Sequence, residues 1–290
     1  MRIVSLACSN TEIVCALGCA DQLVAVDDHS DFPEEVVDGL PKMGPDLDID
    51  VERVGALRPD LVLATLTVPG HERVVERLEA AGLPFVAPEP VSLQDVYRDI
   101  RDIARLLAVP ERGEALVAEM QATLGAGEAG TGVSADPDAG VGTGAGVGAG
   151  ADAGAGAGVG ADPGIDDVPS ILVQWWPKPV ITPGRLSWTT DVLRAAGARA
   201  LLGEEEHKSR PMSDEEVAER RPDAVVLSWC GVHPDKYRPD VVLRNERWAD
   251  LPFVTEGRVY CVGEPYLGRP GPRLVDGVRA MRKIVEGLRA

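Results

Sequence analysis

Short apolar runs alternate with amphipathic stretches along both halves of this 290-residue chain. In the first half, the apolar runs predict strands over 3–6, 23–26, 61–64 and 85–87. In the second half, they predict strands over 171–174, 224–228 and 259–262. The stretches between them carry apolar residues at helical spacing. Because strands that alternate with helices form mainly parallel sheets flanked by helices, the pattern predicts an α/β fold.

Polar residues and prolines mark the ends of the predicted helices. Side chains able to cap a first helical turn are found at Ser9, Asn10, Ser92 with Asp95, and Ser213 with Glu216. The last two pairs have the spacing of a capping box. Prolines end two of the helices, at Pro59 and, for the helix begun by Ser213, at Pro222, because the residue before proline avoids helical geometry.

The two halves resemble each other at one segment. Residues 57–64 read LRPDLVLA and residues 220–227 read RRPDAVVL. In each, proline ends a helix and a polar turn leads into a buried strand. The likeness predicts two similar lobes that face each other. A cleft between such lobes is a common place for a small-molecule site.

A tract of Gly, Ala, Val and Asp separates the halves. It lacks large apolar side chains, so it cannot offset the entropy lost on ordering, and we expect a disordered insertion over 125–168. The expected organisation is an N-terminal lobe over 1–108, a connecting helix over 109–124 and a C-terminal lobe over 169–290. The long helix joining the lobes would limit their hinge motion.

Acidic residues dominate the charge of the chain. Asp and Glu number 47 against 29 Lys and Arg, which gives a formal net charge of −18. A surface this acidic repels phosphate backbones, so we expect no nucleic-acid partner. Acids spread along the chain also suit a high-salt medium, and we treat a halophilic origin as a hypothesis. Unfolding on dilution into low salt would support it.

The cysteines and histidines give no metal-site pattern. The five cysteines form no CxxC pair, and the four histidines form no HxxxH or HExxH pair. Buried free thiols behave as small apolar residues, which is how we interpret the cysteines. No nucleotide-binding or nucleophile motif follows a strand. The sequence therefore favours a binding protein over an enzyme, with no metal and no catalytic cofactor.

Five segments resemble the helical-backbone class, class III, of solute-binding proteins of ABC importers, and most of all its cobalamin-binding branch. They occur in the order 2–13, 28–33, 57–64, 173–177 and 266–277. The resemblance implies two lobes joined by a stiff helix, with the ligand held between them. It implies a cobalamin or related corrinoid as the bound ligand.

The resemblance also implies positions for the ligand contacts. Trp175 corresponds to an aromatic residue that lies against the corrin, and His29 to another in the loop before Phe32. Glu264, Tyr266 and Arg269 correspond to a ligand-contacting loop of the second lobe.

Three further tryptophans join this set. Trp176 and Trp188 stand in for family tryptophans absent here, and Trp229 ends a strand, where ligand sites form in α/β sheets. The expected ligand-binding residues are His29, Phe32, Trp175, Trp176, Trp188, Trp229, Glu264, Tyr266 and Arg269.

Two acids match the family's docking residues. Glu72 and Glu215 each begin a helix, one in each half, and in the family such glutamates meet arginines of the membrane permease. The helix dipole alone also favours an acid at these positions. The expected partners are a corrinoid and the permease and ATPase subunits, and we expect a monomer.

Two alternatives stay open at this point. One is a siderophore- or haem-binding protein on the same scaffold. The other is an intracellular corrinoid-handling protein or enzyme that uses scattered acids such as Asp28, Asp31 and Glu264. The residues from Met1 to Cys8 do not have the pattern of a signal peptide. We expect an extracytoplasmic location if a signal precedes the chain, and a cytoplasmic one if it is complete as given.

Overall fold

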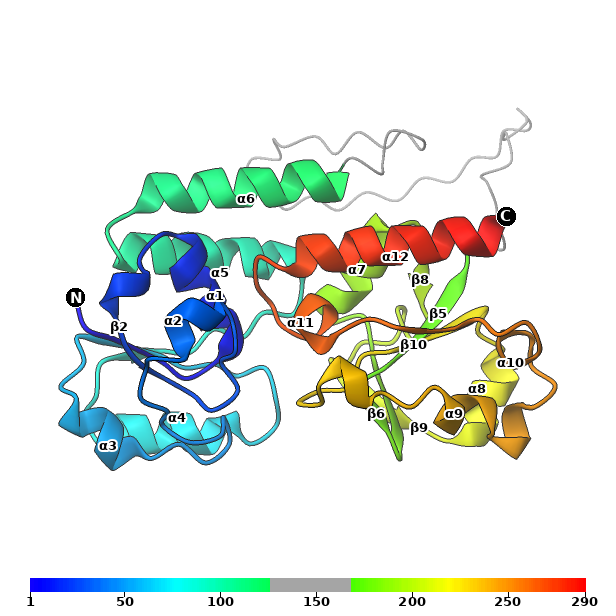
Figure 1. Cartoon of the computed structure of the whole chain (residues 1–290), viewed down its shortest axis with the longest axis horizontal. Helices are drawn as coiled ribbons and strands as arrows, with labels where there is room; N and C mark the ends of the chain where they lie inside the picture. The colour runs from blue at the N-terminus through cyan, green and yellow to red at the C-terminus, as the bar shows by residue number, and fades with distance from the viewer. Residues whose placement is uncertain (126–167) are drawn as a thin grey trace, which may run out of the picture.

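The computed structural model describes residues 1–125 and 168–290, which form two α/β lobes side by side (Figure 1). The first lobe contains the elements up to α5, and the second contains those from β5 onward. The predicted class, with parallel sheets flanked by helices in two lobes, is confirmed. The expected disordered insertion lies outside the described residues, apart from its two ends.

The first lobe is built on a parallel sheet with strand order β2-β1-β3-β4. Its strands are β1 (Ile3–Ser5), β2 (Leu23–Val26), β3 (Leu61–Leu63) and β4 (Phe85–Val86). Every residue of β1 and β3 is buried, as expected for central strands covered on both faces.

The second lobe has a parallel sheet with strand order β11-β10-β5-β8. Its strands are β5 (Ser170–Gln174), β8 (Arg199–Ala200), β10 (Ala224–Leu227) and β11 (Val259–Cys261). A small antiparallel sheet lies beside it, formed by β6 (Trp176–Pro177), β7 (Val180–Pro183) and β9 (Ser209–Met212). The sequence analysis did not predict this small sheet.

Helices cover both sheets. Those of the first lobe and the crossing are α1 (Cys8–Ala16), α2 (Glu34–Val37), α3 (Val51–Ala56), α4 (His71–Ala80), α5 (Leu93–Leu106) and α6 (Pro110–Gly125). Those of the second lobe are α7 (Trp188–Ala195), α8 (Asp214–Arg220), α9 (Asp240–Leu243), α10 (Pro252–Thr255), α11 (Glu264–Leu267) and α12 (Leu274–Arg289). Short 3-10 turns are found at Ala20–Gln22, Pro234–Lys236 and Glu246–Trp248. In the part of the chain that the structure describes, no helix has both the length and the apolar character needed to cross a membrane.

The repeated segment has the same structure in both lobes. Asp60 accepts a hydrogen bond from the backbone N–H of Arg2, just before β1, at 2.6 Å. Asp223 accepts one from the N–H of Ser170, at the start of β5, at 2.7 Å. The residue before proline adopts φ of 46° in both copies. The two RPD sequences thus fasten equivalent pairs of parallel strands, which is why the halves resemble each other there.

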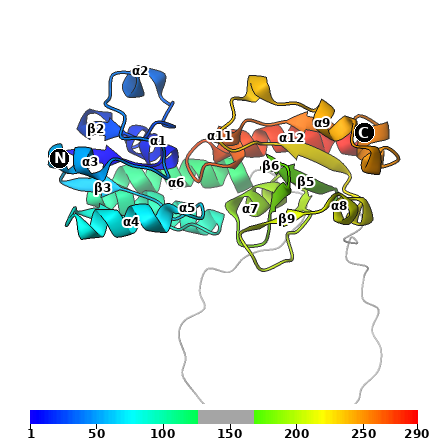
Figure 2. The same cartoon turned by 90° about the horizontal axis from the view of Figure 1, so that it is seen from below.

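Helix α6 lies over the first lobe and its end reaches the second, as Figures 1 and 2 show, and side-chain hydrogen bonds hold it at both ends. Near its start, Arg112 donates to the carbonyl of Leu17 in the first lobe at 3.0 Å. Near its end, Arg282 of α12 donates to the carbonyls of Thr123 and Leu124 at 2.9 and 2.7 Å. One core cluster of buried side chains is continuous from the first lobe through these helices into the second.

Helices α5 and α6 approach each other closely at one glycine. A Cβ added to Gly113 would lie 2.5 Å from the Cβ of Ala104. Such a distance is far below van der Waals contact, so only glycine fits at this crossing. The pairing of the two helices therefore depends on a residue with no side chain.

Two of the predicted helix starts are confirmed. The hydroxyl of Ser92 accepts from the N–H of Asp95, and that of Ser213 accepts from the N–H of Glu216, both at 3.1 Å. These contacts satisfy amides that have no partner within their own helices.

The predicted caps Ser9 and Asn10 are wrong. Helix α1 begins earlier, at Cys8, and its N-cap is Ala7, which makes no side-chain capping bond. Asn10 instead donates from Nδ2 to the carbonyl of Ala64 at 2.8 Å. The side chain is used to join α1 to the end of β3, so it is not available to cap.

Candidate ligand-binding cleft

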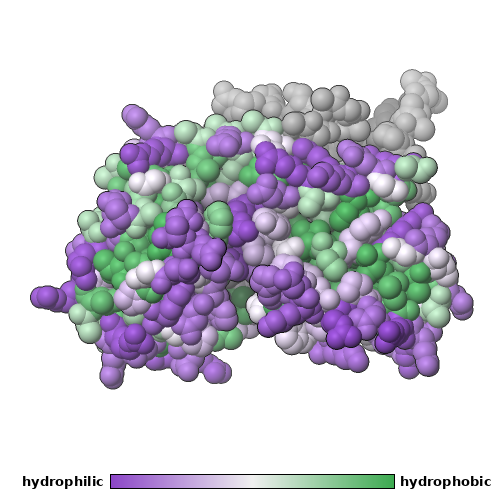
Figure 3. Space-filling view, in the orientation of Figure 1, coloured by the Kyte–Doolittle hydropathy of each residue, from purple (hydrophilic) through white to green (hydrophobic). Residues whose placement is uncertain are grey.

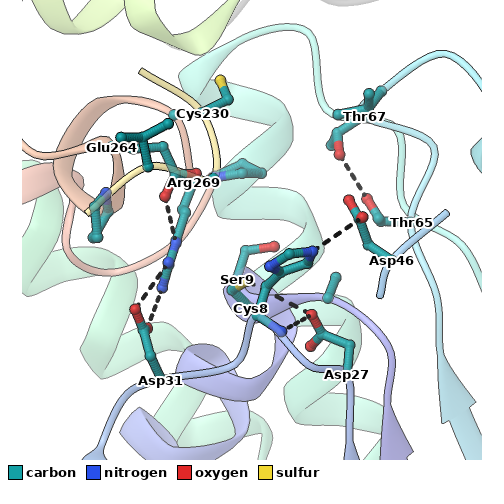
Figure 4. A pocket seen from close by; sticks show the side chains of 18 of the residues that line it. Cys8, Ser9, Asp27, Asp31, Asp46, Thr65, Thr67, Cys230, Glu264 and Arg269 are labelled. Carbon is teal, nitrogen blue, oxygen red and sulfur yellow. Dashed lines mark hydrogen bonds and ion pairs between the residues drawn. The ribbon is translucent and has the colours of Figure 1, made fainter. Parts of the chain in front are cut away.

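A cleft of about 670 Å³ lies between the two lobes. Its lining comes from segments that follow β1, β2 and β3 in the first lobe, and β10 and β11 in the second (Figure 4). The space-filling view shows hydrophilic side chains on both sides of the hollow between the lobes (Figure 3). Ligand sites in parallel α/β sheets form at these carboxyl ends of strands. The fold therefore brings chain segments from both halves to one site.

The first-lobe wall is mostly polar. It is formed by Ala7, Cys8, Ser9, Asp27, Asp28, His29, Asp31, Asp46, Thr65, Thr67, Val68 and His71. Asp27 is fully buried and accepts from the hydroxyl of Ser30 and the N–H of His29. Burial raises its pKa, and those hydrogen bonds oppose the rise. The turn after β2 is therefore held in shape by its own carboxylate.

An imidazole fixes the carboxylate of Asp46 in the same wall. His71 is only 3% exposed, and its Nδ1 accepts from the N–H of Val68 at 3.1 Å. Its Nε2 therefore carries the hydrogen and donates to Asp46 at 3.2 Å. This hydrogen bond lowers the pKa of Asp46. His29 lies on the other side, with Nε2 3.6 Å from Asp46.

Arg269 of the second lobe crosses to the first. It donates to both carboxylate oxygens of Asp31, at 2.5 and 3.1 Å, and to Glu12 at 3.1 Å. Its Nε donates to Glu264 of its own lobe at 2.9 Å. Burial alone would raise the pKa of Asp31, but Arg269 outweighs it and the pKa is lowered. One guanidinium thus joins three carboxylates across the lobes.

Glu12 is the most deeply buried acid of this group, at 3% exposure. Burial raises its pKa to about 7, against the charges of Arg269 and Arg273. Its Oε1 accepts from both arginines, whereas its Oε2 has no partner in the described part of the chain. The guanidinium of Arg273 also lies over the rings of Phe32 and Tyr266, at 4.4 and 4.8 Å.

Two cysteine thiols also line the cleft. Cys8 lies at the start of α1 and Cys230 follows β10. Burial raises the pKa of the Cys8 thiol, whereas Cys230 is exposed. Cys8 is therefore a neutral thiol at ordinary pH and a poor nucleophile. The five cysteines are all free.

Four of the predicted ligand residues line the cleft: His29, Glu264, Tyr266 and Arg269. Phe32 is 44% exposed and lies at its edge, beneath the Arg273 guanidinium. These side chains come from positions more than two hundred residues apart, and the fold brings them to one site.

None of the four predicted tryptophans is among the lining residues. Trp188 and Trp229 are each 6% exposed and donate from Nε1 within the core, to Leu267 and Gln174. Trp175 is partly buried and stacks on Trp188, with ring centroids 6.4 Å apart. Trp176 is 44% exposed in the small antiparallel sheet. Among the described residues that line the cleft, Tyr266 is the one Phe, Tyr or Trp side chain.

The predicted docking acids both lie on exposed first turns. Glu72 of α4 accepts from the N–H of Gly70 at 2.7 Å, which lowers its pKa together with its own backbone N–H. Glu215 of α8 forms an ion pair with Arg247. The two lie on different lobes, and neither lines the cleft.

The sequence analysis missed Asp46, His71 and Glu12. Asp46 and His71 lie outside the predicted strand ends, in a loop and at a helix start. Glu12 carried a signal, because an acid inside a short apolar helix needs a buried partner. In residues 1–125 and 168–290, no group of three or more His, Cys, Asp or Glu side chains is placed to hold a metal ion.

Comparison with known proteins identifies relatives over nearly the whole chain. The family model described as periplasmic binding protein matches residues 3–146 and 152–266. An ABC transporter substrate-binding lipoprotein, YvrC, of Bacillus subtilis (strain 168) is 26% identical over 98% of this chain and 79% of its own. A vitamin B12-binding protein of Vibrio campbellii is 25% identical over 99% of this chain and 90% of its own.

Solved structures share the fold. The periplasmic haem-binding protein RhuT of Roseiflexus sp. RS-1 superposes with a TM-score of 0.74 at 24% identity, over 100% of this chain and 99% of its own. The periplasmic vitamin B12-binding protein BtuF of Vibrio cholerae superposes with a TM-score of 0.69 at 20% identity, over 99% and 97%. Proteins named for different ligands therefore have this architecture.

Proposed function

Because the chain belongs to the periplasmic binding protein family, in its class III form, we propose that it captures cobalamin or a related corrinoid between its lobes for uptake by an ABC importer. Its role is binding and delivery, not catalysis. We take residues 1–108 and 169–290 as the two lobes and 109–124 as the connecting helix.

The observation that carries the proposal is the composition of the cleft walls. Asp28 and His29 of the first lobe face the same cavity as Glu264 and Tyr266 of the second. A ligand held there touches both lobes at once, which is how a two-lobed receptor recognises a large solute. The volume of about 670 Å³ is in the range of cofactor-sized sites.

Two features favour a corrinoid. Two relatives named vitamin B12-binding protein align with 99% and 96% of this chain. A corrin also carries amide groups around its rim, and the cleft presents carboxylates and hydroxyls that accept hydrogen bonds from amides. Tyr266 supplies a ring for its apolar face, and His29 is exposed at the opposite wall.

Titration with cyanocobalamin and dicyanocobinamide tests the proposal. We expect a shift in corrin absorbance and, by calorimetry, a dissociation constant below about 1 μM, which corresponds to roughly −8 kcal/mol. Tyr266→Leu should weaken binding about tenfold. Tyr260→Leu, at a partly buried tyrosine outside the cleft, is the control and should bind as the wild type does. The absence of any heat or spectral change at high protein concentration would refute the proposal.

Haem is the second candidate ligand. His29, His233 and Tyr266 all line the cleft, and imidazole and phenol groups are ligands of haem iron. Competition between haemin and cyanocobalamin separates the two candidates. The corrinoid proposal predicts that cyanocobalamin displaces haemin; displacement in the other direction favours haem.

We also propose an extracytoplasmic monomer that docks through Glu72 and Glu215 on a permease whose ATPase drives uptake. Glu72 is exposed and free of an ion pair among the described residues, and Glu215 would exchange Arg247 for a permease arginine. Glu72→Lys should abolish stimulation of the reconstituted transporter's ATPase. Glu79→Lys, exposed on the same helix, should leave it unchanged.

A further inference from the structure

The cleft lining is strongly unbalanced in charge. Two guanidiniums, of Arg269 and Arg273, line it. The carboxylates that line it are Asp27, Asp28, Asp31, Asp46 and Glu264. Asp27 is fully buried, and Asp31 and Glu264 are paired with Arg269. All of the five except Glu264 belong to the first lobe, and Figure 4 labels Asp27, Asp31 and Asp46 among them.

The protein itself uses Arg269 fully and Arg273 in part. Arg269 is 8% exposed and donates to Asp31, Glu12 and Glu264. Arg273 donates to Glu12 and lies over two aromatic rings. In the described part of the lining, Arg273 is therefore the one guanidinium with donors left for a ligand, and it belongs to the second lobe.

Two carboxylates on the first-lobe wall, those of Asp28 and Asp46, remain able to accept hydrogen bonds from a ligand. Asp28 is exposed, and one of its oxygens accepts from the N–H of Gly44 at 3.1 Å, which leaves the other free. Asp46 is held by His71, which fills one oxygen and favours the ionised form. Its second oxygen lies 3.6 Å from His29, a longer and weaker contact.

We propose that this carboxylate wall, Asp28 with Asp46, selects the ligand by the charge of its rim. It favours a macrocycle whose rim carries amide N–H donors and rejects one whose rim carries carboxylates. The inference rests on the proposed function and narrows its substrate class. A corrin with intact amides meets the requirement, whereas haem, with two propionates, does not.

The physical reason is the cost of placing like charges together in a partly dehydrated cleft. An amide replaces its water contacts with a charge-assisted hydrogen bond to a carboxylate. A carboxylate at the same point gains no bond and is repelled by Asp28 and Asp46. Because the charges lie near solvent, the effect should shrink as salt rises.

The test compares two pairs of ligands that differ only at the rim. The first pair is cyanocobalamin and a cobalamin monocarboxylic acid, in which one amide is hydrolysed. The second is haemin bis-amide and haemin. For the macrocycle that the cleft binds, we expect the amide form to bind about tenfold more tightly than the carboxylate form at low salt. The ratio of the two dissociation constants should fall at 0.5 M salt.

A variant pair assigns the discrimination to the wall. Asp28→Asn with Asp46→Asn keeps hydrogen-bonding side chains and removes both charges, and should bring the amide-to-carboxylate ratio close to one. Glu119→Gln removes an exposed charge from α6, outside the cleft, and should leave the ratio unchanged. Circular dichroism shows whether each variant is folded before binding is measured.

The outcomes separate this inference from the proposed function. If haemin bis-amide binds and neither corrinoid does, the corrinoid proposal fails and the charge inference stands. If a corrinoid binds but its monocarboxylic acid binds as tightly, the charge inference fails and the corrinoid proposal stands. If neither ring binds in either form, both are overturned.

Discussion

Arg269 and Asp31 join the two lobes through a bidentate ion pair, in which Nη1 and Nη2 of the arginine each donate to one carboxylate oxygen. Asp31 lies in the turn after β2, and Arg269 lies between α11 and α12. The same guanidinium also donates to Glu12 of α1 and to Glu264, which lines the cleft. A buried cation thus joins the lobes beside the cleft, in addition to the shared core and the contacts of α6.

Arg269→Met should destabilise the protein by about 3 kcal/mol, because it leaves the buried carboxylates of Glu12 and Glu264 without their main partner. Urea unfolding measures the loss. Arg279→Met removes an exposed pair with Asp276 and should cost less than about 1 kcal/mol. An equal loss of unfolding free energy in the two variants would show that the buried ion pairs stabilise the protein no more than an exposed pair does.

Glu12 makes stability depend on pH. Its pKa is raised from an ordinary 4.5 to about 7 in the folded chain. Between these values the folded chain keeps a proton that the unfolded chain has lost, so the free energy of unfolding falls as pH rises across this window. The stabilisation is fully present below about pH 4.5 and lost above about pH 7.

Glu12→Gln removes this titration. The difference in unfolding free energy between variant and wild type should shift in favour of the variant by about 1–3 kcal/mol between pH 5 and pH 8. Urea unfolding at several pH values measures it. A difference independent of pH would mean that Arg269 and Arg273 keep Glu12 ionised throughout.

Gly113→Ala should destabilise the pairing of α5 and α6 by about 1–3 kcal/mol, because the new methyl group would overlap Ala104. Alanine is otherwise the better helix former, so without the overlap this substitution would stabilise the helix. The sign of the change in unfolding free energy therefore reports on the packing. Gly287→Ala is the matched control, since a Cβ there meets nothing within 4 Å of the described atoms. It should be neutral or stabilising by up to about 1 kcal/mol. Thermal unfolding compares the two, and a stabilising Gly113→Ala would contradict the packing seen here.

The two stacked tryptophans should respond differently to loss of the indole nitrogen. Trp188→Phe removes a buried hydrogen bond of 2.9 Å to Leu267 and should cost about 1–2 kcal/mol. Trp175→Phe removes an N–H that has no partner in the described part of the chain and should cost less. Chemical unfolding measures the loss of unfolding free energy in both variants. A larger loss for Trp175→Phe than for Trp188→Phe would contradict the prediction.

Local signals in the sequence predict most of the fold. The RPD repeat and the capping serines act within a few residues, so their effect is visible in the pattern. The small antiparallel sheet was missed because all three of its strands contain or end at proline, which argues against a strand.

The site was less predictable, because its contacts join distant positions. Arg269 and Glu12 are separated by 257 residues, and nothing local to either one indicates the pair. Trp175 was assigned to the ligand from the family resemblance, and Trp176 and Trp188 as substitutes for absent family tryptophans. Trp229 was assigned from its place at a strand end. In the structure two of them are core residues, because an indole can bury its ring and still donate to a backbone carbonyl or an amide oxygen.

The most direct test of a corrinoid between the lobes is anomalous diffraction at the cobalt edge from crystals grown with dicyanocobinamide. The account predicts one cobalt peak per chain, inside the cleft bounded by His29 and Tyr266. A peak elsewhere on the protein, or no peak in crystals of protein saturated with the corrinoid, would contradict it.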